Sequence, residues 1–331
     1  MPVVQPATNG VHRGTALFAP IVSDLAEVER LFARKLASHR GHVARLVSHL
    51  EQYRGKRLRP ALLLLTARAC GRVASAHHVL GAVVEMIHTA TLVHDDVLDE
   101  ADLRRHVTTV NAGWGNQASI LLGDMLFSHA FHLASSVDTT ACEIIGRATN
   151  RVCEGELHQV NERGNMDLSE EDYFDMIDGK TAELTACCCQ LGAMYAEAND
   201  EVVERLTAYG RALGIAFQIA DDLLDLVGIE ESTGKTLGTD LAQGKLTLPI
   251  IHMLERLPSS EAATVRALLA DANTPRESLL PYLRQTNALN YARRRAEEHA
   301  TAARDSLAIL PPGECRSLLL SLTDWTVRRE K

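Results

Sequence analysis

Two clusters of aspartates in this sequence each combine three carboxylates with apolar neighbours. The clusters, DDVLD at 95–99 and DDLLD at 221–225, have the same spacing. On an α-helix successive residues lie ~100° apart, so Asp95 and Asp99 share a face, with Asp96 to one side. Like charges placed together destabilise a helix unless a cation neutralises them, and oxygen ligands suit Mg²⁺, which commonly bridges to substrate phosphates. The second cluster repeats this geometry with Asp221, Asp222 and Asp225.

A lone acidic cluster is more often a solvated helix face, but two copies inside apolar helices favour a magnesium site. Basic residues accompany both clusters. GKRLRP at 55–60 precedes a strongly apolar segment, Arg104 and Arg105 follow the first cluster, and three lysines lie in or beside glycine-containing segments: Lys180, Lys235 and Lys245. Each cation alone is more often a surface charge. Together they predict phosphate binding, because arginine pairs and lysines near helix ends contact phosphate oxygens well.

Apolar residues recur at helical spacing along most of the chain, so we expect an all-α protein of around a dozen helices. Ser169, with Asp172 three residues later, predicts the start of a helical stretch through Met194. Thr274 is the expected N-cap of a later helix, and Pro311-Pro312-Gly313 separates the last two helices. No linker divides the chain, so we expect a flexible N-terminal arm over 1–19 and a single domain over 20–331.

The composition restricts the classes of partner and the cellular compartment that we expect for this protein. The formal charge of −9 argues against nucleic acid or an anionic membrane as the main partner. No apolar run approaches the ~20 residues that span a bilayer, and the start of the chain lacks the pattern of a signal peptide. The seven cysteines, including the run Cys187, Cys188 and Cys189, show no metal-ligand spacing. They predict reduced, buried thiols in a cytoplasmic protein.

With these residues assembled, the chain resembles the all-trans polyprenyl diphosphate synthases. The resemblance follows GKRLRP, IHTATLVHDDVLDEADLRR, LLGD, EGE, GKTA, FQIADDLLD and GKTLGTDLAQGKLTLP in order, over about two-thirds of the chain. It implies a single-domain orthogonal helical bundle around a deep central cavity, the isoprenoid synthase type of fold. It also implies a homodimer with three Mg²⁺ ions per active site, which condenses isopentenyl diphosphate with an allylic diphosphate.

The resemblance assigns roles to residues at matching positions. Asp95 and Asp99, with Asp96 in support, correspond to ligands of the first magnesium motif, and Asp221, with Asp222 and Asp225 beside it, corresponds to the second. The residues implied to bind isopentenyl diphosphate are Lys56, Arg59, His88 and Arg105. Those implied for the allylic diphosphate, with Lys180 also counted as catalytic, are Arg104, Lys180, Thr181, Gln218, Lys235 and Lys245. The chain departs from the family at His106, where glycine is usual, but both arginines before it remain.

Product length is expected to depend on the residues one turn before the first cluster. Ala90 and Thr91 are small, which resembles the longer-chain enzymes, whereas short-chain members commonly carry aromatic residues there. Phe127 and Phe131 are spaced to share a helix face and are candidates for the floor of the cavity, with ordinary core packing an equal alternative. We therefore expect a product of about octaprenyl size for a quinone side chain, with membrane contact for its release. A short-chain geranylgeranyl or farnesyl diphosphate synthase is the alternative.

Three other classes are weaker candidates. A His-Asp metal-dependent phosphohydrolase accounts for His94-Asp95 but leaves DDLLD and GKTA unexplained. A class I terpene cyclase shares the first motif but ordinarily carries a different second metal motif. A non-catalytic subunit of a heteromeric synthase would be expected to have degraded aspartates, and both clusters are intact here.

Overall fold

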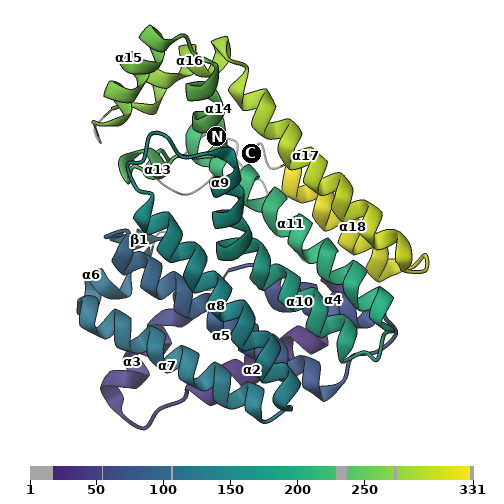
Figure 1. Ribbon diagram of the computed structural model, residues 1–331. Helices are drawn as coiled ribbons and strands as arrows, with labels where there is room; N and C mark the ends of the chain where they lie inside the picture. Colours follow the sequence, from purple (N-terminus) through teal and green to yellow (C-terminus); the bar gives the residue numbers. More distant parts are fainter. Residues whose placement is uncertain (1–17, 54, 106, 229–236, 272–273, 329–331) are drawn as a thin grey trace, which may run out of the picture.

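The computed structural model describes residues 18–53, 55–105, 107–228, 237–271 and 274–328 (Figure 1). Lys235 and His106 lie outside these ranges. So does the predicted N-terminal arm, apart from its last two residues, of which Ala19 already begins a helical turn. Within the described ranges, no helix has both the length and the apolar character needed to cross a membrane.

The first half of the chain contains helices and one short hairpin. Its elements, with η marking a short 3₁₀ helix, are η1 (Ala19–Ile21), α2 (Val22–Leu36), α3 (Gly41–Leu50), η2 (Glu51–Tyr53), α4 (Leu58–Ala69), α5 (Ser75–Leu98), β1 (Leu103–Arg104), β2 (Val107–Thr108), α6 (Val110–Trp114), α7 (Asn116–Ser135) and α8 (Thr139–Asn161). The hairpin was not expected. It forms where Arg105 takes a left-handed φ of 52°, a conformation that suits a tight turn between antiparallel strands.

In the second half, all the regular elements among the described residues are helices. Its elements are α9 (Glu170–Ile177), the π-helical turn η3 (Asp178–Ala182), α10 (Glu183–Met194), α11 (Asp200–Val227), α13 (Thr239–Ala242), α14 (Leu248–Arg256), α15 (Ser259–Leu269), η4 (Arg276–Leu279), α16 (Leu280–Gln285), α17 (Ala288–Ser306), η5 (Leu307–Ile309) and α18 (Glu314–Val327).

Two of the three predicted helix boundaries are confirmed. The Ser169 hydroxyl accepts a hydrogen bond from the backbone N–H of Asp172 at 3.1 Å, and helix continues from there to Met194 through η3. The break before α18 falls at the two prolines, as expected. The predicted N-cap at Thr274 is wrong, because its hydroxyl donates to the Leu268 carbonyl at 2.6 Å and η4 begins two residues later.

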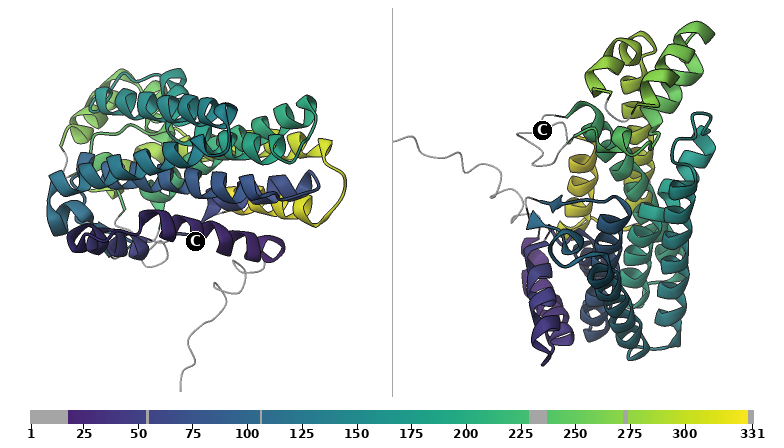
Figure 2. Two further views of the ribbon diagram at one scale, coloured as in Figure 1. Left: turned by 90° about the horizontal axis from the view of Figure 1, so that it is seen from below. Right: turned by 90° about the vertical axis from the view of Figure 1, so that its left-hand side faces the viewer.

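Long helices lie side by side in the body of the molecule, while α14, α15 and α16 gather at one end (Figures 1 and 2). The helix α5 packs along α7, and α11 packs against α10 on one side and α17 on another. Two hydrophobic clusters form the core, and α11 contributes to both: Leu213 belongs to the first cluster and Ile219 to the second. This one helix therefore connects the two parts of the core.

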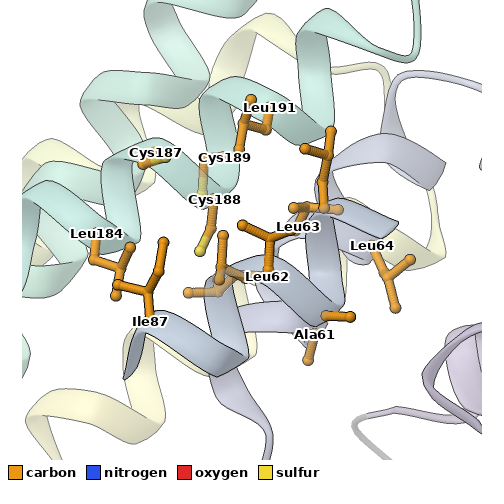
Figure 3. Packing of buried hydrophobic residues seen from close by; sticks show 14 of the residues in the cluster. Ala61, Leu62, Leu63, Leu64, Ile87, Leu184, Cys187, Cys188, Cys189 and Leu191 are labelled. Carbon is orange, nitrogen blue, oxygen red and sulfur yellow. The ribbon is translucent and has the colours of Figure 1, made fainter. Parts of the chain in front are cut away.

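The cysteine run is buried in the first cluster, as predicted. Figure 3 shows the three cysteines along α10, with Cys188 pointing toward Leu62 of α4. All seven cysteines are free thiols, and burial raises the pKa of Cys187 and of Cys189 to about 12. These thiols therefore serve as small apolar side chains that allow α4 and α10 to pack closely.

Candidate active site

The first aspartate cluster lies at the C-terminal end of α5. A helix C-terminus carries partial negative charge, so carboxylates there are unfavourable without cations nearby. The pKa of Asp95 is raised to about 6, mainly by burial and also by Glu156 and Asp99, while Lys180 and Arg104 oppose the rise. The negative potential at this end of α5 is therefore only partly balanced by the protein.

The other two carboxylates of this cluster contact cations that lie outside α5. Asp96, which is 1% exposed, accepts a hydrogen bond from Arg104 Nε at 2.7 Å. Asp99 contacts Lys245 Nζ at 3.0 Å and Arg163 Nη2 at 2.7 Å. The sequence predicted Arg104 and Lys245 as phosphate-binding residues, and the structure places both directly on the first aspartate cluster.

The second cluster lies near the C-terminal end of α11. Asp222 is buried and accepts hydrogen bonds from Tyr173 Oη at 2.6 Å and from Gln218 Nε2 at 2.7 Å. Burial raises its pKa to about 6 despite these bonds. Asp225 accepts from the backbone N–H groups of Thr239 at 3.3 Å and Asp240 at 3.1 Å, so it caps the start of α13.

The turn η3 links the two clusters. Lys180 donates to Glu156 at 2.7 Å and to Gln159 at 2.9 Å on α8, and Asp95 and Glu156 raise its pKa against the lowering effect of burial. Its neighbour Thr181 donates to Gln218 Oε1 at 2.7 Å. Lys180 thus interacts electrostatically with Asp95 of the first cluster, and Thr181 is linked to Asp222 of the second cluster through Gln218. Such π-helical turns are frequent at functional sites.

The third group of predicted residues forms a basic region beside the first cluster. His88 is surrounded by arginines, and burial, followed by Arg59 and Arg105, lowers its pKa well below the ordinary value. Burial also lowers the pKa of Arg59, whose Nε has no hydrogen-bond partner among the described residues. A Cβ on Gly55 would lie 2.4 Å from the Arg105 guanidinium, so a larger residue there would displace this guanidinium from its position. A buried, incompletely bonded guanidinium beside a neutral imidazole suits an anionic ligand.

Lys56, the remaining member of this group, has its ammonium 4.4 Å from the centre of the Trp325 ring on α18. This is a cation–π contact between two ends of the chain. Next to it, Arg57 forms an ion pair with the buried Glu85 of α5. The pair fixes the segment that carries Lys56 against the helix that carries the first cluster.

Several residues at the site were not assigned by sequence reasoning. Glu156 lies in the EGE motif, to which the sequence analysis gave no role. Glu85 lies within an apolar helical segment, and a glutamate in such a segment indicates a buried ion pair. Tyr173, Arg163 and Trp325 gave no local signal, because their partners are distant in the sequence.

Donor chemistry at the two clusters fits a divalent cation. The aspartates offer only oxygen ligands, and burial, together with neighbouring carboxylates, raises the pKa values of Asp95 and Asp222, so a bound cation would favour their ionised form. In the part of the chain that the structure describes, no three His, Cys, Asp or Glu side chains form a group that could hold a metal ion. Mg²⁺ commonly takes one or two carboxylates together with substrate phosphates, so the donor set remains suited to it.

The residues expected to control product length lie in different surroundings. Ala90 is fully buried in the first core cluster, whereas Thr91 is half-buried on the face of α5 that carries Asp95. Phe127 packs against that cluster, and Phe131 is 36% exposed. A hollow of about 540 Å³ among α14, α16 and α17 is lined by none of the predicted site residues.

His94 faces α7, where its Nε2 also lies 3.8 Å from Asp124 Oδ1, and not the two aspartate clusters. Its Nε2 lies 3.1 Å from the Ile120 carbonyl oxygen of α7, and its ring centre lies 5.8 Å from that of Phe127. His94 and Asp95 therefore point to different surroundings, which argues against the phosphohydrolase alternative.

Comparison with known proteins agrees with this geometry. A family model described as polyprenyl synthetase matches residues 41–285. The octaprenyl diphosphate synthase of Escherichia coli (strain K12) is 38% identical over 312 residues, covering 93% of this chain and 96% of that protein. The structure of a decaprenyl diphosphate synthase from Rhodobacter capsulatus matches with a TM-score of 0.90 and 35% identity, covering 96% of this chain and 99% of that one.

A second solved structure is equally similar. It is a polyprenyl synthase from Caulobacter crescentus CB15 complexed with calcium and isoprenyl diphosphate, with a TM-score of 0.90, 34% identity, and coverage of 99% of this chain and 100% of that one. These matches confirm the expected helical isoprenoid synthase fold and the resemblance inferred from the motifs. The chain belongs to the polyprenyl synthetase family.

Proposed function

We propose that this protein is a long-chain trans-prenyltransferase, which repeatedly condenses isopentenyl diphosphate with an allylic diphosphate to a product of about octaprenyl size. The observation that carries the proposal is the junction at η3, where Lys180 interacts electrostatically with Asp95 and Thr181 is linked to Asp222 through Gln218. A lysine between two sets of carboxylates, together with the metal ions that the carboxylates would hold, can bind a diphosphate. The octaprenyl and decaprenyl relatives, together with the small residues Ala90 and Thr91, favour a long product over a geranylgeranyl or farnesyl product.

The proposed metal ligands are Asp95, Asp99 and Asp221, with three Mg²⁺ ions per active site. When bound, these ions supply positive charge that stabilises the departing diphosphate. The calcium and isoprenyl diphosphate in the Caulobacter structure support a divalent cation in that relative, and the oxygen donors here support one in this chain. Asp96 and Asp222 are proposed to orient the ligands, and Asp225 to hold α13 beside them.

The two substrates are proposed to occupy different cationic regions. The region for isopentenyl diphosphate comprises Lys56, Arg59, His88 and Arg105. The allylic diphosphate is proposed to contact Arg104, Lys180, Thr181, Gln218, Lys235 and Lys245, of which Lys235 lies outside the described residues. The buried Nε of Arg59, which has no hydrogen-bond partner among the described residues, and the lowered pKa of His88 favour an anion in the first region.

In the proposed reaction the protein supplies electrostatic stabilisation and no nucleophile. Cationic side chains stabilise the charge that accumulates on the departing diphosphate, and Lys180 is placed to do so because Asp95 and Glu156 favour its charged form. The allylic cation is then attacked by the double bond of isopentenyl diphosphate. Loss of a proton, with the released diphosphate as the proposed base, gives a chain five carbons longer. Apolar helix faces exclude water from the cation.

The wider organisation is also proposed. We infer that residues 20–331 act as one domain, since α11 contributes to both core clusters. A homodimer, a cytoplasmic location and peripheral membrane contact for product release complete the proposal. The seven free thiols support a reducing compartment.

The test is incubation with isopentenyl diphosphate, Mg²⁺ and allylic primers of different length, with product size read by mass spectrometry. We expect products that lengthen in five-carbon steps to about octaprenyl size. Asp95→Ala and Asp221→Ala should each lower the rate by at least about a hundredfold, if the carboxylates hold charge that develops in the transition state. No condensation by the wild-type protein would overturn the proposal, and near-normal rates in folded aspartate variants would overturn the metal assignment.

A further inference from the structure

Asp99 is contacted by two cations at once in this structure. Arg163 Nη2 and Lys245 Nζ lie 2.7 and 3.0 Å from the same atom, Asp99 Oδ1, and Lys245 lies 3.1 Å from Oδ2. Arg163 also donates from Nη1 to the Leu98 carbonyl at 3.1 Å. One carboxylate thus faces two positive charges, while Asp95, one turn earlier, has its pKa raised by burial.

Arg163 is held in this position by its loop. It follows α8, and the backbone N–H of the next residue, Gly164, donates to the Gly244 carbonyl at 2.8 Å. Gly244 directly precedes Lys245, and Gln243 in the same loop donates to the backbone carbonyl of Asp99 at 3.3 Å. The loop after α8 and the loop after α13 are therefore bonded to each other, and both contact Asp99.

Arg163 and Lys245 pair with Asp99, the same carboxylate that the proposed function assigns to Mg²⁺. A divalent ion bound to Asp99 Oδ1 would lie within a few ångströms of both positive groups, and like charges at such distances repel appreciably even near a protein surface. Lys245 can turn to an incoming diphosphate. Before a diphosphate binds, Arg163 is held at Asp99 more firmly than Lys245, because it also donates to the Leu98 carbonyl at the end of α5.

We propose that Arg163 is a positioning residue that stands in for the metal on Asp99, keeping this carboxylate engaged until a diphosphate draws the cations away. This inference rests on the proposed metal role of Asp99. In this arrangement the metal ion alone binds weakly, because Arg163 and Lys245 already pair with Asp99. The metal ion binds well together with a diphosphate, because the diphosphate then accepts the hydrogen bonds of these two side chains. Arg163 thereby couples metal binding to the presence of the substrate.

Substitution of Arg163 separates this role from a purely structural one. Arg163→Gln removes the competing charge, so Mn²⁺ alone should bind about tenfold more tightly, by removal of one nearby like charge. The same variant loses an ion pair, so its melting temperature without metal should fall by about 1–3 °C. If Arg163 had only a structural role, Arg163→Gln would bind metal more weakly and be less stable. The proposal instead predicts that this variant binds metal more tightly although it is less stable.

Two variants serve as controls. Arg163→Lys keeps the charge and should bind Mn²⁺ as the wild type does. Arg266→Gln removes another ion pair to the connection between α8 and α9, in which Arg266 Nη2 lies 2.6 Å from Asp167 Oδ1. This pair includes no carboxylate of either cluster. The variant should leave Mn²⁺ binding unchanged.

Binding is measured by electron paramagnetic resonance of free Mn²⁺, with and without inorganic diphosphate. The proposal expects diphosphate to tighten Mn²⁺ binding more in the wild type than in Arg163→Gln. Equal or weaker Mn²⁺ binding by Arg163→Gln would overturn the role of Arg163. If the wild type binds no Mn²⁺ even with diphosphate, the proposed metal site itself fails, so the two failures are distinguishable.

Discussion

At the scale of single residues, the site concentrates carboxylates whose charge the protein only partly balances. Burial raises the pKa of Asp95 and of Asp222 to about 6, and burial with the charges of Asp222 and Asp225 raises that of Asp240 to about 8. Ionising these carboxyl groups in the folded state therefore costs free energy. A bound cation would stabilise the ionised form, so both the stability of the protein and its metal binding depend on the protonation of these carboxyl groups.

This dependence gives a prediction for pH and magnesium. A raised folded-state pKa means that the native protein binds the proton more tightly than the unfolded chain, so stability from this source falls as pH rises from the ordinary value of 3.8 through about 6. Mg²⁺ competes with that proton and favours the ionised form. The increase in melting temperature caused by MgCl₂ should therefore be larger at about pH 7.5 than at about pH 5.

Thermal melts with and without MgCl₂ at both pH values check this expectation. Asp95→Asn removes one of the titrating ligands and should reduce the difference between the two pH values. An equal effect of MgCl₂ at both values in the wild type would contradict the link between these carboxylates and the metal.

At the scale of elements, α5 carries both the first cluster and the residues expected to limit the product. Thr91 lies one turn before Asp95 on the same face, and Ala90 lies about 100° away in the buried core. A phenylalanine at either position adds bulk near the start of the path proposed for the growing chain. Both variants should therefore give shorter products than the wild type, as read by mass spectrometry.

The two variants should differ in stability. Ala90 is 0% exposed, so Ala90→Phe should overpack the core and lower the free energy of unfolding by roughly 1–3 kcal/mol, whereas the half-buried Thr91 should tolerate the change better. A folded Thr91→Phe variant with an unchanged product distribution would mean that the chain follows another path.

The turn η3 depends on close approach by α8. A Cβ on Gly155 of α8 would lie 2.5 Å from the backbone nitrogen of Lys180 and 3.0 Å from the carbonyl carbon of Gly179. Gly155→Ala should push η3 away and misplace Lys180, lowering kcat/KM by about ten- to a hundredfold. Steady-state kinetics with the allylic substrate measures the loss.

Gly146, on the same helix, is the matched control because a Cβ there meets nothing within 4 Å. Gly146→Ala should leave the rate unchanged and stabilise α8 by about 0.5–1 kcal/mol, since alanine favours helix over glycine. A normal rate in Gly155→Ala would show that η3 does not require this contact.

The elements also show how far sequence can predict the site. Helical periodicity predicts the helices, and the four-residue spacing of Gln218 and Asp222 places them together on α11. Contacts between Asp99 and Lys245, 146 residues apart, depend on packing of separate segments and leave no periodic pattern. The hairpin after α5 depends on the left-handed backbone of Arg105, a conformation that an arginine does not signal.

At the scale of the whole molecule, α11 joins two core clusters, and the aspartates lie where segments from both halves of the chain meet. The first cluster is on α5, and the two cations on Asp99 come from the loops after α8 and α13. Trp325 of α18 contacts Lys56. The site is therefore completed only when the chain folds as a whole. Family resemblance could predict which residues meet, but local sequence could not.

One face of α7 remains uncovered in the single chain. Ile120 and Leu121 are 45% and 67% exposed, and Trp114 just before the helix is 43% exposed. Exposed apolar residues gathered along one element often mark a protein interface. We therefore expect this face of α7 to contribute to the proposed homodimer.

Leu121→Glu tests this expectation, because a charge at the centre of an apolar interface costs several kcal/mol when it is buried without a partner. The variant should shift the protein from dimer to monomer in sedimentation analysis, while its helical circular dichroism stays that of the wild type, since Leu121 is largely exposed in the monomer. Val22→Glu is the control, because Val22 is also an exposed apolar residue, at 58%, but lies on α2. If the Leu121→Glu variant remains a dimer, the dimer uses another face. If the wild-type protein is a monomer, the exposed face of α7 is not a homodimer interface.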